Sequence, residues 1–303
     1  MTCVEMTFYS EDGKSEEHKL ILREWEKHPW TAIKQIFRYP RGVFYFFLHR
    51  CRIMPFREGN KTDELINSIL GFKPAMVCIT YEGERYMFKL GSLGCGVGPL
   101  MEIIVYNQYD ISPAIVKGKV GIDVGANIGA FSIMAAKMGA KKVYAFEPVK
   151  ETYELLKENI RLNKLGSIIK PYNCAVSNET EKTVTIYYKF AGDMAASLHP
   201  HFKPGKKKKQ KVKVSRLDDV GKSVDFIKID AEGSERAILI GAQRLLAKHK
   251  PHLMLSAYHR KNDKTELPKA IYQGCKDYSC KVIKRDNEET LICQVAAGVK
   301  KSE

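Results

Sequence analysis

The architecture of the chain follows from the stretch Val120-Gly-Ile-Asp-Val-Gly-Ala-Asn-Ile-Gly129. Its first half is a short apolar run typical of a buried strand, and its second half is a glycine-rich turn. Gly125 and Gly129 let the backbone turn sharply and come close to a ligand. Residues 130–138 have the apolar spacing of a helix. The stretch therefore predicts a strand, a tight turn and a helix in direct succession.

Strands and helices alternate on the carboxyl side of Gly118. We expect strands over 120–123, 142–146, 168–175, 183–188, 224–229, 252–257, 280–284 and 291–295, helices over 130–138, 151–163, 234–248 and 264–273, and a polar loop over 191–209. Such alternation predicts a mostly parallel sheet with helices on both faces. A charged turn joins the last two strands into a hairpin, which can place one antiparallel strand in the sheet.

A carboxylate follows the second of these strands. Glu147, in Phe146-Glu-Pro148, comes roughly twenty residues after the glycine turn, where an acid can accept both hydroxyls of a ribose. Together the turn and the acid predict a nucleoside site; the alternative is a tight turn and a surface Glu. The spacing G-x-x-x-G lacks the middle glycine that admits a pyrophosphate, which disfavours NAD. S-adenosylmethionine fits better, and Asp123 would complement its cationic part.

A second glycine-rich segment, Leu93-Gly-Cys-Gly-Val-Gly98, resembles such a turn superficially. The strand before it alternates in polarity and Pro99 follows it. No strand ending in an acid lies at the right distance downstream. We interpret it as a connection, either beside the active site or between subdomains.

The chain is divided into three segments by its pattern. Residues 1–74 are predicted as a helical N-terminal extension, residues 75–118 as a hairpin with a connecting segment, and residues 119–303 as the main domain. The hairpin strands, 75–81 and 85–90, flank Glu82-Gly-Glu84.

The N-terminal extension is expected to be helical from Glu16 to Met54, with a further short helix over 63–70. Its stretch from Phe37 to Arg50 mixes aromatic and basic residues. This stretch either packs on the main domain or contacts a membrane or a partner.

Positive charge is in excess and partly concentrated. The chain has 50 Lys and Arg against 35 Asp and Glu, a formal net charge of +15. This favours an anionic partner such as nucleic acid, a phosphorylated sugar or a membrane surface. Seven lysines lie between Lys203 and Lys213, including Lys206, Lys207, Lys208 and Lys209. The run is either a solvated loop or a contact for an anionic substrate.

The eight cysteines show no C-x-x-C and no Cys/His cluster at zinc spacing. We therefore expect reduced thiols in a cytoplasmic protein. The N-terminus lacks the layout of a signal peptide, and the longest apolar run, Val43 to Leu48, is too short to cross a bilayer. Secretion and membrane insertion are not expected, and no oligomeric state is indicated.

Five motifs resemble, in order, those of the FkbM-type methyltransferases. They are Ile122-Asp-Val-Gly-Ala-Asn-Ile-Gly129, Phe146-Glu-Pro148, Ala175-Val-Ser177, Arg216-Leu-Asp-Asp219 and Asp225-Phe-Ile-Lys-Ile-Asp-Ala-Glu-Gly-Ser-Glu235. The resemblance implies a class I methyltransferase fold, an α/β Rossmann-like domain with a mostly parallel seven-stranded sheet. It also implies S-adenosylmethionine as donor and an oxygen acceptor on a sugar, glycan or other hydroxylated small molecule. The lysine-rich insertion departs from the family pattern and puts that acceptor class in question.

The resemblance also assigns the cofactor contacts. Gly125, Asn127 and Gly129 would border the methionine part, Glu147 the ribose, and Ala175 and Ser177 the adenine edge. Ser177 is otherwise explained as a turn residue.

Methyl transfer from a sulfonium is an in-line displacement, so the protein must position the acceptor oxygen and remove its proton. Asp230 and Glu232 follow a strand, and ligands meet an open α/β sheet at the carboxyl ends of its strands. Asp230 or His259 is the candidate base, with Glu232 as a third candidate catalytic residue. Alternatively, Glu232 is a cap or first-turn acid of the next helix, and His259 is structural. The two acids could bind Mg²⁺, but no third ligand is identified and the metal stays open.

Two other functions stay open. An RNA methyltransferase would use the lysines from Lys203 to Lys213, although no RNA-binding module is visible. A non-catalytic protein would keep the fold and use Phe37–Arg50 and the lysine run to contact an anionic membrane or a partner.

Overall fold

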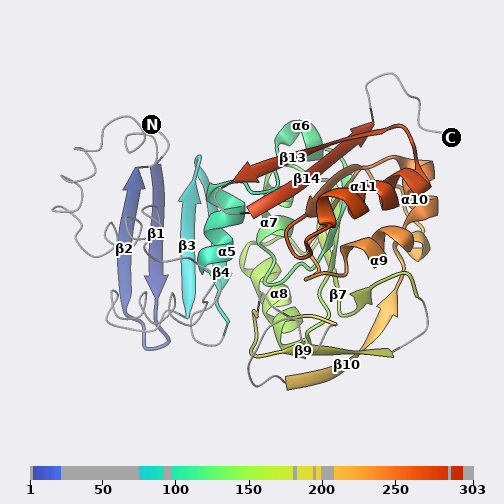
Figure 1. Cartoon of the computed structure of the whole chain (residues 1–303). Coiled ribbons are helices and arrows are strands. Elements are labelled where there is room, and N and C mark those ends of the chain that lie inside the picture. Colours follow the sequence, from blue (N-terminus) through green and yellow to red (C-terminus); the bar gives the residue numbers. More distant parts are fainter. Residues whose placement is uncertain are drawn as a thin grey trace. The chain divides into compact units, whose positions relative to one another are not determined.

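The computed structural model describes residues 3–21, 75–91, 97–179, 183–193, 196–198, 208–285 and 288–295. The chain divides into two compact units, Met1–Met101 and Glu102–Glu303 (Figure 1). Three predicted features lie outside the described residues: the aromatic and basic stretch 37–50, the helix over 63–70 and most of the second glycine-rich segment.

The first unit contains an antiparallel four-stranded sheet in the order β2-β1-β3-β4. Its strands are β1 (Cys3–Tyr9), β2 (Ser15–Ile21), β3 (Met76–Tyr81) and β4 (Glu84–Lys89), and the short helix α5 (Val97–Leu100) follows. The predicted hairpin over 75–90 is confirmed as β3 and β4. The helix expected from Glu16 is wrong at its beginning, because Ser15–Ile21 pairs along its whole length with β1. Pairing with a distant segment overrides a weak local helix pattern.

The second unit is built on a seven-stranded sheet in the order β13-β14-β12-β11-β5-β6-β7. The strands are β5 (Val120–Val124), β6 (Lys142–Phe146), β7 (Ile169–Tyr172), β11 (Phe226–Ile229), β12 (His252–Ser256), β13 (Tyr278–Arg285) and β14 (Glu288–Val295). The neighbouring strands β12, β11, β5, β6 and β7 are all parallel. Strand β14 pairs antiparallel with both β12 and β13. The predicted mostly parallel sheet with a C-terminal antiparallel strand is confirmed.

Helices cover both faces of this sheet. Beyond the π-helical turn Met101–Val105 and the 3-10 turn Leu217–Asp219, they are α6 (Pro113–Val116), α7 (Ala130–Lys137), α8 (Lys150–Leu162), α9 (Glu235–Ile240), α10 (Gln243–His249) and α11 (Asp263–Gly274). Neighbouring residues of a strand point to opposite faces. Ile227 of β11 joins a core cluster with residues of α9, α10 and α11, whereas Phe226 contacts Phe131 of α7.

The single helix expected over Ser234–Lys248 is wrong, because the chain breaks it into α9 and α10 at Gly241. A Cβ atom at Gly241 would lie 2.3 Å from the carbonyl oxygen of Ser177. The glycine thus permits the backbone of residues 177–178 to come close at this point.

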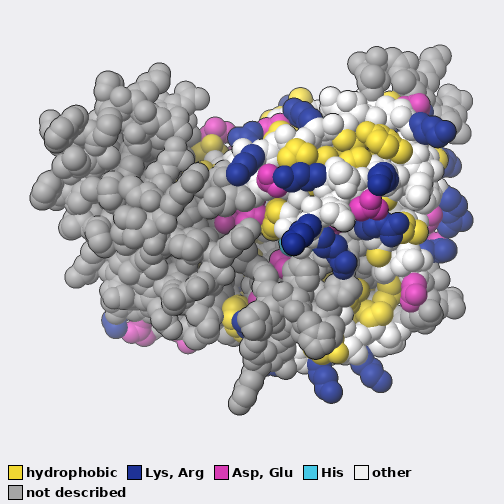
Figure 2. Space-filling view, in the orientation of Figure 1, with side chains coloured by type: hydrophobic (Ala, Val, Ile, Leu, Met, Phe, Trp, Pro, Cys, Tyr) yellow, Lys and Arg dark blue, Asp and Glu magenta, His cyan; other side chains and the backbone are white. Residues whose placement is uncertain are grey.

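A separate three-stranded sheet, in the order β8-β10-β9, lies in the same unit. Its strands are β8 (Ala175–Val176), β9 (Thr183–Tyr188) and β10 (Lys208–Ser215). The polar loop predicted to extend to Lys209 is wrong at its end, since Lys208 and Lys209 already belong to β10. The alternation of Lys211, Val212, Lys213 and Val214 is the pattern of a half-buried strand. Figure 2 shows basic side chains projecting at the edge of the molecule where β10 runs.

Cys280 and Cys293 are directly opposite each other in β13 and β14 and form a disulfide. The expectation of reduced thiols is therefore wrong for this pair, whereas Cys78, Cys174 and Cys275 are free. Structural disulfides persist mainly in oxidising compartments. This pair therefore does not support the cytoplasmic location expected from the sequence, which stays a prediction. None of the helices in the described ranges has the length and hydropathy that a membrane crossing requires.

Candidate active site

The turn after β5 is held in place by its neighbours on two strands. Gly125, Asn127 and Gly129 all have positive φ, at 73°, 49° and 101°. The backbone N–H groups of Gly125 and Ala126 both donate to the carbonyl oxygen of Phe146, at 3.0 Å. A Cβ atom on Gly125 would lie 1.8 Å from the backbone oxygen of Asp230. The glycine thus allows the turn to lie directly against the segment that follows β11.

We expect Gly125→Ala to lower the free energy of unfolding by about 2 to 5 kcal/mol. The left-handed conformation costs a residue with a Cβ roughly 1–2 kcal/mol, and overpacking adds about 1–3 kcal/mol. Denaturant unfolding of the full chain measures the loss. Gly166→Ala is the matched control, because a Cβ there meets nothing within 4 Å. Equal stability of the two variants would contradict the proposed contact with Asp230.

Glu147 is buried directly beyond β6 and is bound to the glycine turn. Its Oε2 accepts a hydrogen bond from the backbone N–H of Asn127, and its Oε1 accepts one from Val149, both at 2.9 Å. Burial raises the pKa of Glu147 to about 7, and the two backbone hydrogen bonds oppose that rise only in part. Glu147 forms no ion pair with any residue that the structure describes. Its carboxylate is thus fixed in position by backbone groups, with no cation at ion-pair distance in the described part of the chain.

The predicted adenine contacts follow β7. Asn173 ties this segment to Glu147, because its Nδ2 donates to the carbonyl oxygens of Glu147 and Pro148 at 2.9 Å. Ala175 is buried in β8. The Ser177 N–H donates to the Ser215 carbonyl at 3.0 Å, and its Oγ lies 3.1 Å from Asn178 Oδ1. A contact of Ala175 or Ser177 with adenine stays a prediction.

Asp123 and Lys228 form a fully buried ion pair on neighbouring strands. The Lys228 Nζ lies 3.2 Å from Asp123 Oδ1, and both side chains are at most 3% exposed. Ser132 Oγ donates to Asp123 Oδ2 at 2.7 Å. Lys228 also donates to the carbonyl oxygen of Gly125 at 2.8 Å. Asp123, predicted to face the cofactor, is thus engaged within the protein, and its cofactor contact stays a prediction.

Asp230 begins the segment after β11 and accepts a hydrogen bond from Tyr109, which lies far away in the sequence. The Tyr109 hydroxyl donates to Asp230 Oδ2 at 2.8 Å and lies 3.2 Å from the hydroxyl of Ser256, on β12. Burial by itself would raise the pKa of Asp230. The charges of Lys228 and His259, with the Tyr109 hydrogen bond, outweigh it and lower the pKa below the usual value.

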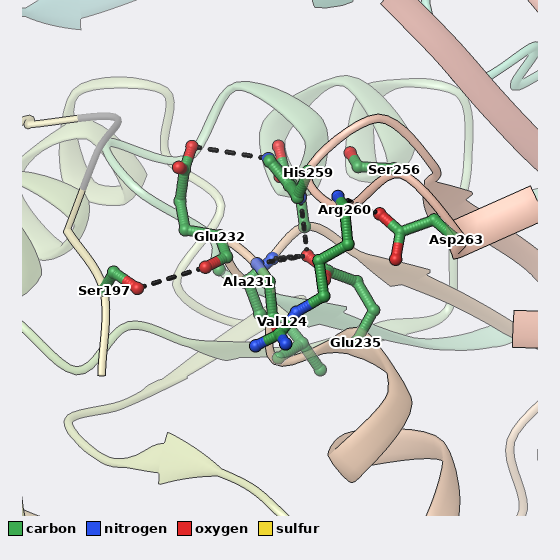
Figure 3. A network of polar contacts seen from close by, with 12 residues as sticks. Val124, Ser197, Ala231, Glu232, Glu235, Ser256, His259, Arg260 and Asp263 are labelled. Carbon is green, nitrogen blue, oxygen red and sulfur yellow. Dashed lines mark hydrogen bonds and ion pairs between the residues drawn. The ribbon is translucent and has the colours of Figure 1, made fainter. Parts of the chain in front are cut away.

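The three predicted catalytic residues, Asp230, Glu232 and His259, lie together just after the carboxyl ends of β11 and β12. Figure 3 shows Glu232 and His259 facing each other. The Nε2 atom of His259 is 3.6 Å from Asp230 Oδ1 and 3.5 Å from Glu232 Oε1. On the other side of the ring, Nδ1 lies 2.9 Å from Oε1 of the buried Glu235. Burial opposes the charge on the ring, but Glu232, Glu235 and Asp230 outweigh it and raise the pKa of His259 to about 11.

Glu232 does not cap the following helix. Ser234 occupies the cap position of α9, and Glu235 is the acid of its first turn. Glu232 has a φ of 48° and lies outside the helix, so that its side chain faces His259 (Figure 3). The alternative explanation of Glu232 as a helix-terminal acid is therefore wrong.

Several residues of this site were missed in the sequence. Lys228 interrupts the apolar strand Phe226–Ile229, and a lone cation in a buried strand is a usable signal, because Lys is almost never fully buried without a partner. Glu235 is the last residue of the fifth motif, but the motif gives it no role. Tyr109 gave no signal, since it reaches Asp230 from 121 residues away.

Comparison with known proteins places this site in a family. The methyltransferase FkbM domain matches residues 123–278, just over half of the chain. Methyltransferase sdnD from Sordaria araneosa is 29% identical over 46% of this chain and 66% of its own length, so the match spans slightly less than two thirds of that relative.

Two solved structures illustrate the structural likeness. The methyltransferase FkbM from Methylobacillus flagellatus is 24% identical, with a TM-score of 0.45, over 62% of this chain and 49% of its own. The ribosomal protein L11 methylase from Lactobacillus delbrueckii subsp. bulgaricus is 16% identical, with a TM-score of 0.39, over 64% and 77%. The matched domain contains the glycine turn, Glu147 and the cluster around His259. The sheet has its single antiparallel strand in the C-terminal hairpin, as the sequence pattern predicts. The chain thus belongs to the FkbM methyltransferase domain family and has the class I methyltransferase fold.

Proposed function

We propose that the protein transfers a methyl group from S-adenosylmethionine to a hydroxyl oxygen of a sugar, a glycan or another small molecule. One observation supports this most directly. The glycine turn and Glu147 are joined by the Asn127 hydrogen bond, and the same turn lies against the backbone of Asp230. A candidate nucleoside site and a candidate proton acceptor thus share one edge of the sheet.

The residues present fit S-adenosylmethionine. Each carboxylate oxygen of Glu147 accepts one backbone hydrogen bond and keeps a second lone pair, so that it can accept from a ribose hydroxyl. A buried carboxylate held by backbone groups is well suited to a neutral diol. Gly125 and Gly129 leave the turn without side chains of its own at these positions.

The bound cofactor supplies an electrophilic methyl group: the acceptor oxygen forms the new C–O bond while the S–C bond breaks and its electron pair stays on sulfur. The protein has to remove the proton of the acceptor hydroxyl. We assign this to the carboxylate of Asp230, whose Oδ1 lies 3.6 Å from Nε2 of His259. Tyr109, whose hydroxyl also lies 3.2 Å from that of Ser256, holds Asp230 in position.

Transfer of labelled methyl groups tests this function. The full chain is incubated with labelled S-adenosylmethionine and with sugar, lipid-glycan or RNA fractions, and labelled products are identified. Calorimetry with S-adenosylmethionine and its demethylated product measures cofactor binding separately. Labelled ether products support the proposal. Absence of binding to both compounds by the folded protein contradicts it.

The affinity for the cofactor should depend on pH through Glu147. The pKa of its free carboxyl is about 7, and ribose hydroxyls donate to the ionised form, so binding lowers that pKa and releases a proton. Affinity should therefore fall about tenfold from pH 8 to pH 6, as follows from the fraction of carboxylate ionised. Calorimetry in buffers of different ionisation enthalpy counts the protons. Glu147→Gln should bind more weakly and without this pH dependence; an unchanged pH profile in that variant would refute the assignment.

An anionic acceptor, including RNA, is favoured by the exposed face of β10. Lys209, Lys211 and Lys213 alternate along this strand and are exposed. Lys208 instead lies 3.0 Å from Glu151, and Lys206 and Lys207 lie outside the described residues. We expect the KM for an anionic acceptor to rise with salt. Replacing the three exposed lysines by Gln should flatten that dependence. The same salt slope in both proteins would argue against the strand as a contact.

A further inference from the structure

We propose that Asp230, Glu232 and His259 form a binding site for one divalent transition-metal ion that orients the acceptor hydroxyl. This inference rests on the proposed methyl transfer and deepens it. One potential donor atom from each residue lies within 4.8 Å of the others. The three residues come from the segments after two adjacent parallel strands, which is where an open α/β sheet presents its ligand site.

The donor atoms face one another. His259 Nε2 lies 3.6 Å from Asp230 Oδ1 and 3.5 Å from Glu232 Oε1. Asp230 Oδ1 is buried and accepts no hydrogen bond from any described residue. The other oxygen of Asp230 already accepts from Tyr109. Asp230 thus has one oxygen that is fixed by the protein and one that is directed at the imidazole.

A second carboxylate orients the imidazole from behind. His259 Nδ1 lies 2.9 Å from Glu235 Oε1, which also accepts from the N–H groups of Ala231 at 2.8 Å and Gly233 at 3.3 Å. The Glu235 side chain is only 1% exposed. Metal-binding histidines characteristically donate their other N–H to such a carboxylate, which fixes the ring and its tautomer. Glu235 is thus a positioning residue, and it directs Nε2 toward the two acids.

The donor set indicates the class of ion. Carboxylates suit Mg²⁺, Ca²⁺ and Mn²⁺, whereas an imidazole favours first-row transition metals over Mg²⁺. Three protein ligands leave open positions, as catalytic metal sites do. With the ion bound, Asp230 Oδ1 and His259 Nε2 are ligands and no longer proton acceptors, so an acceptor hydroxyl on the ion loses its proton to water. Its oxygen then forms the C–O bond, and the S–C electron pair stays on sulfur.

Titration of the metal-free full chain with Mn²⁺ tests the site. Electron paramagnetic resonance separates free from bound Mn²⁺, and we expect one bound ion per chain. Glu232→Gln and His259→Gln should each weaken binding at least tenfold. Glu235→Gln should weaken it about 10- to 100-fold, as expected for a group that only orients a ligand. Glu154→Gln, which replaces an exposed acid on α8, should leave it unchanged.

Folding and cofactor binding are measured on the same samples. Circular dichroism shows whether each variant is folded, and calorimetry with the demethylated cofactor shows whether the nucleoside site is intact. If the folded wild type leaves Mn²⁺ free, or if Glu232→Gln binds it as tightly as the wild type, the metal site is refuted. If the protein still binds the cofactor and transfers methyl groups at the full rate after a chelator has removed all metal ions, the inference fails while the proposed function stands.

Discussion

Replacing Asp230 by Asn should lower turnover by about 100- to 10,000-fold, the range that a positioned acid–base group contributes. Asn cannot accept a proton and is a poorer metal ligand, so turnover falls in either role of the carboxylate. The affinity for S-adenosylmethionine should stay within about threefold, because Asp230 contacts the glycine turn through its backbone oxygen, which the substitution retains. Single-turnover kinetics and calorimetry separate the two quantities. The Tyr109 hydroxyl can still donate to the Asn oxygen, so folding should be preserved.

Glu147→Ala is the complementary variant. It removes the acceptor from the candidate ribose site and leaves the cluster around His259 in place, so it should weaken cofactor binding. Turnover at saturating cofactor should then fall far less than in Asp230→Asn. If both variants lose cofactor affinity to the same extent, Asp230 belongs to the cofactor site and the assignment of its role is wrong.

The sheet could be predicted from the sequence because its signals are local. Each apolar run is short and is followed by a turn or a helix start, so the parallel strands β5, β6, β7, β11 and β12 and the final hairpin were recognised. β10 was missed because its lysines outweigh Val212 and Val214 in any average over the segment. The β2 strand was missed because its conformation is stabilised by hydrogen bonds to β1, whereas its own sequence shows no clear strand pattern.

The candidate site could be predicted only in part, because only some of its residues are marked by a local pattern. Asp230, Glu232 and His259 follow two strands, and the rule for carboxyl ends of parallel strands predicts a common edge. Their orientation depends on Glu235 and Tyr109, which no spacing rule connects to them. The disulfide between Cys280 and Cys293 depends on the register of a hairpin, which cysteine spacing alone does not supply.

Lys228→Met should be among the most destabilising single substitutions in the described core. Removing one member of a buried ion pair leaves the other charge uncompensated, at a cost of about 3–5 kcal/mol. Here Asp123 would keep, among the described residues, only the side-chain hydrogen bond from Ser132, and the carbonyl of Gly125 would lose the hydrogen bond from Lys228. Denaturant unfolding should show the loss. Because the glycine turn is then less fixed, cofactor affinity should fall as well.

A double-mutant cycle distinguishes the ion pair from simple loss of packing. Asp123→Asn removes the negative charge but retains the shape, so in its presence Lys228→Met no longer leaves a buried charge unpaired. The double variant should be more stable than the sum of the two single losses predicts, by about 1 to 3 kcal/mol, the upper range for residues in one buried network. Strict additivity would mean that the 3.2 Å contact between Lys228 and Asp123 contributes no coupling. The loss would then come from the other contacts of Lys228, the cation–π contact with Tyr109 and the hydrogen bond to Gly125.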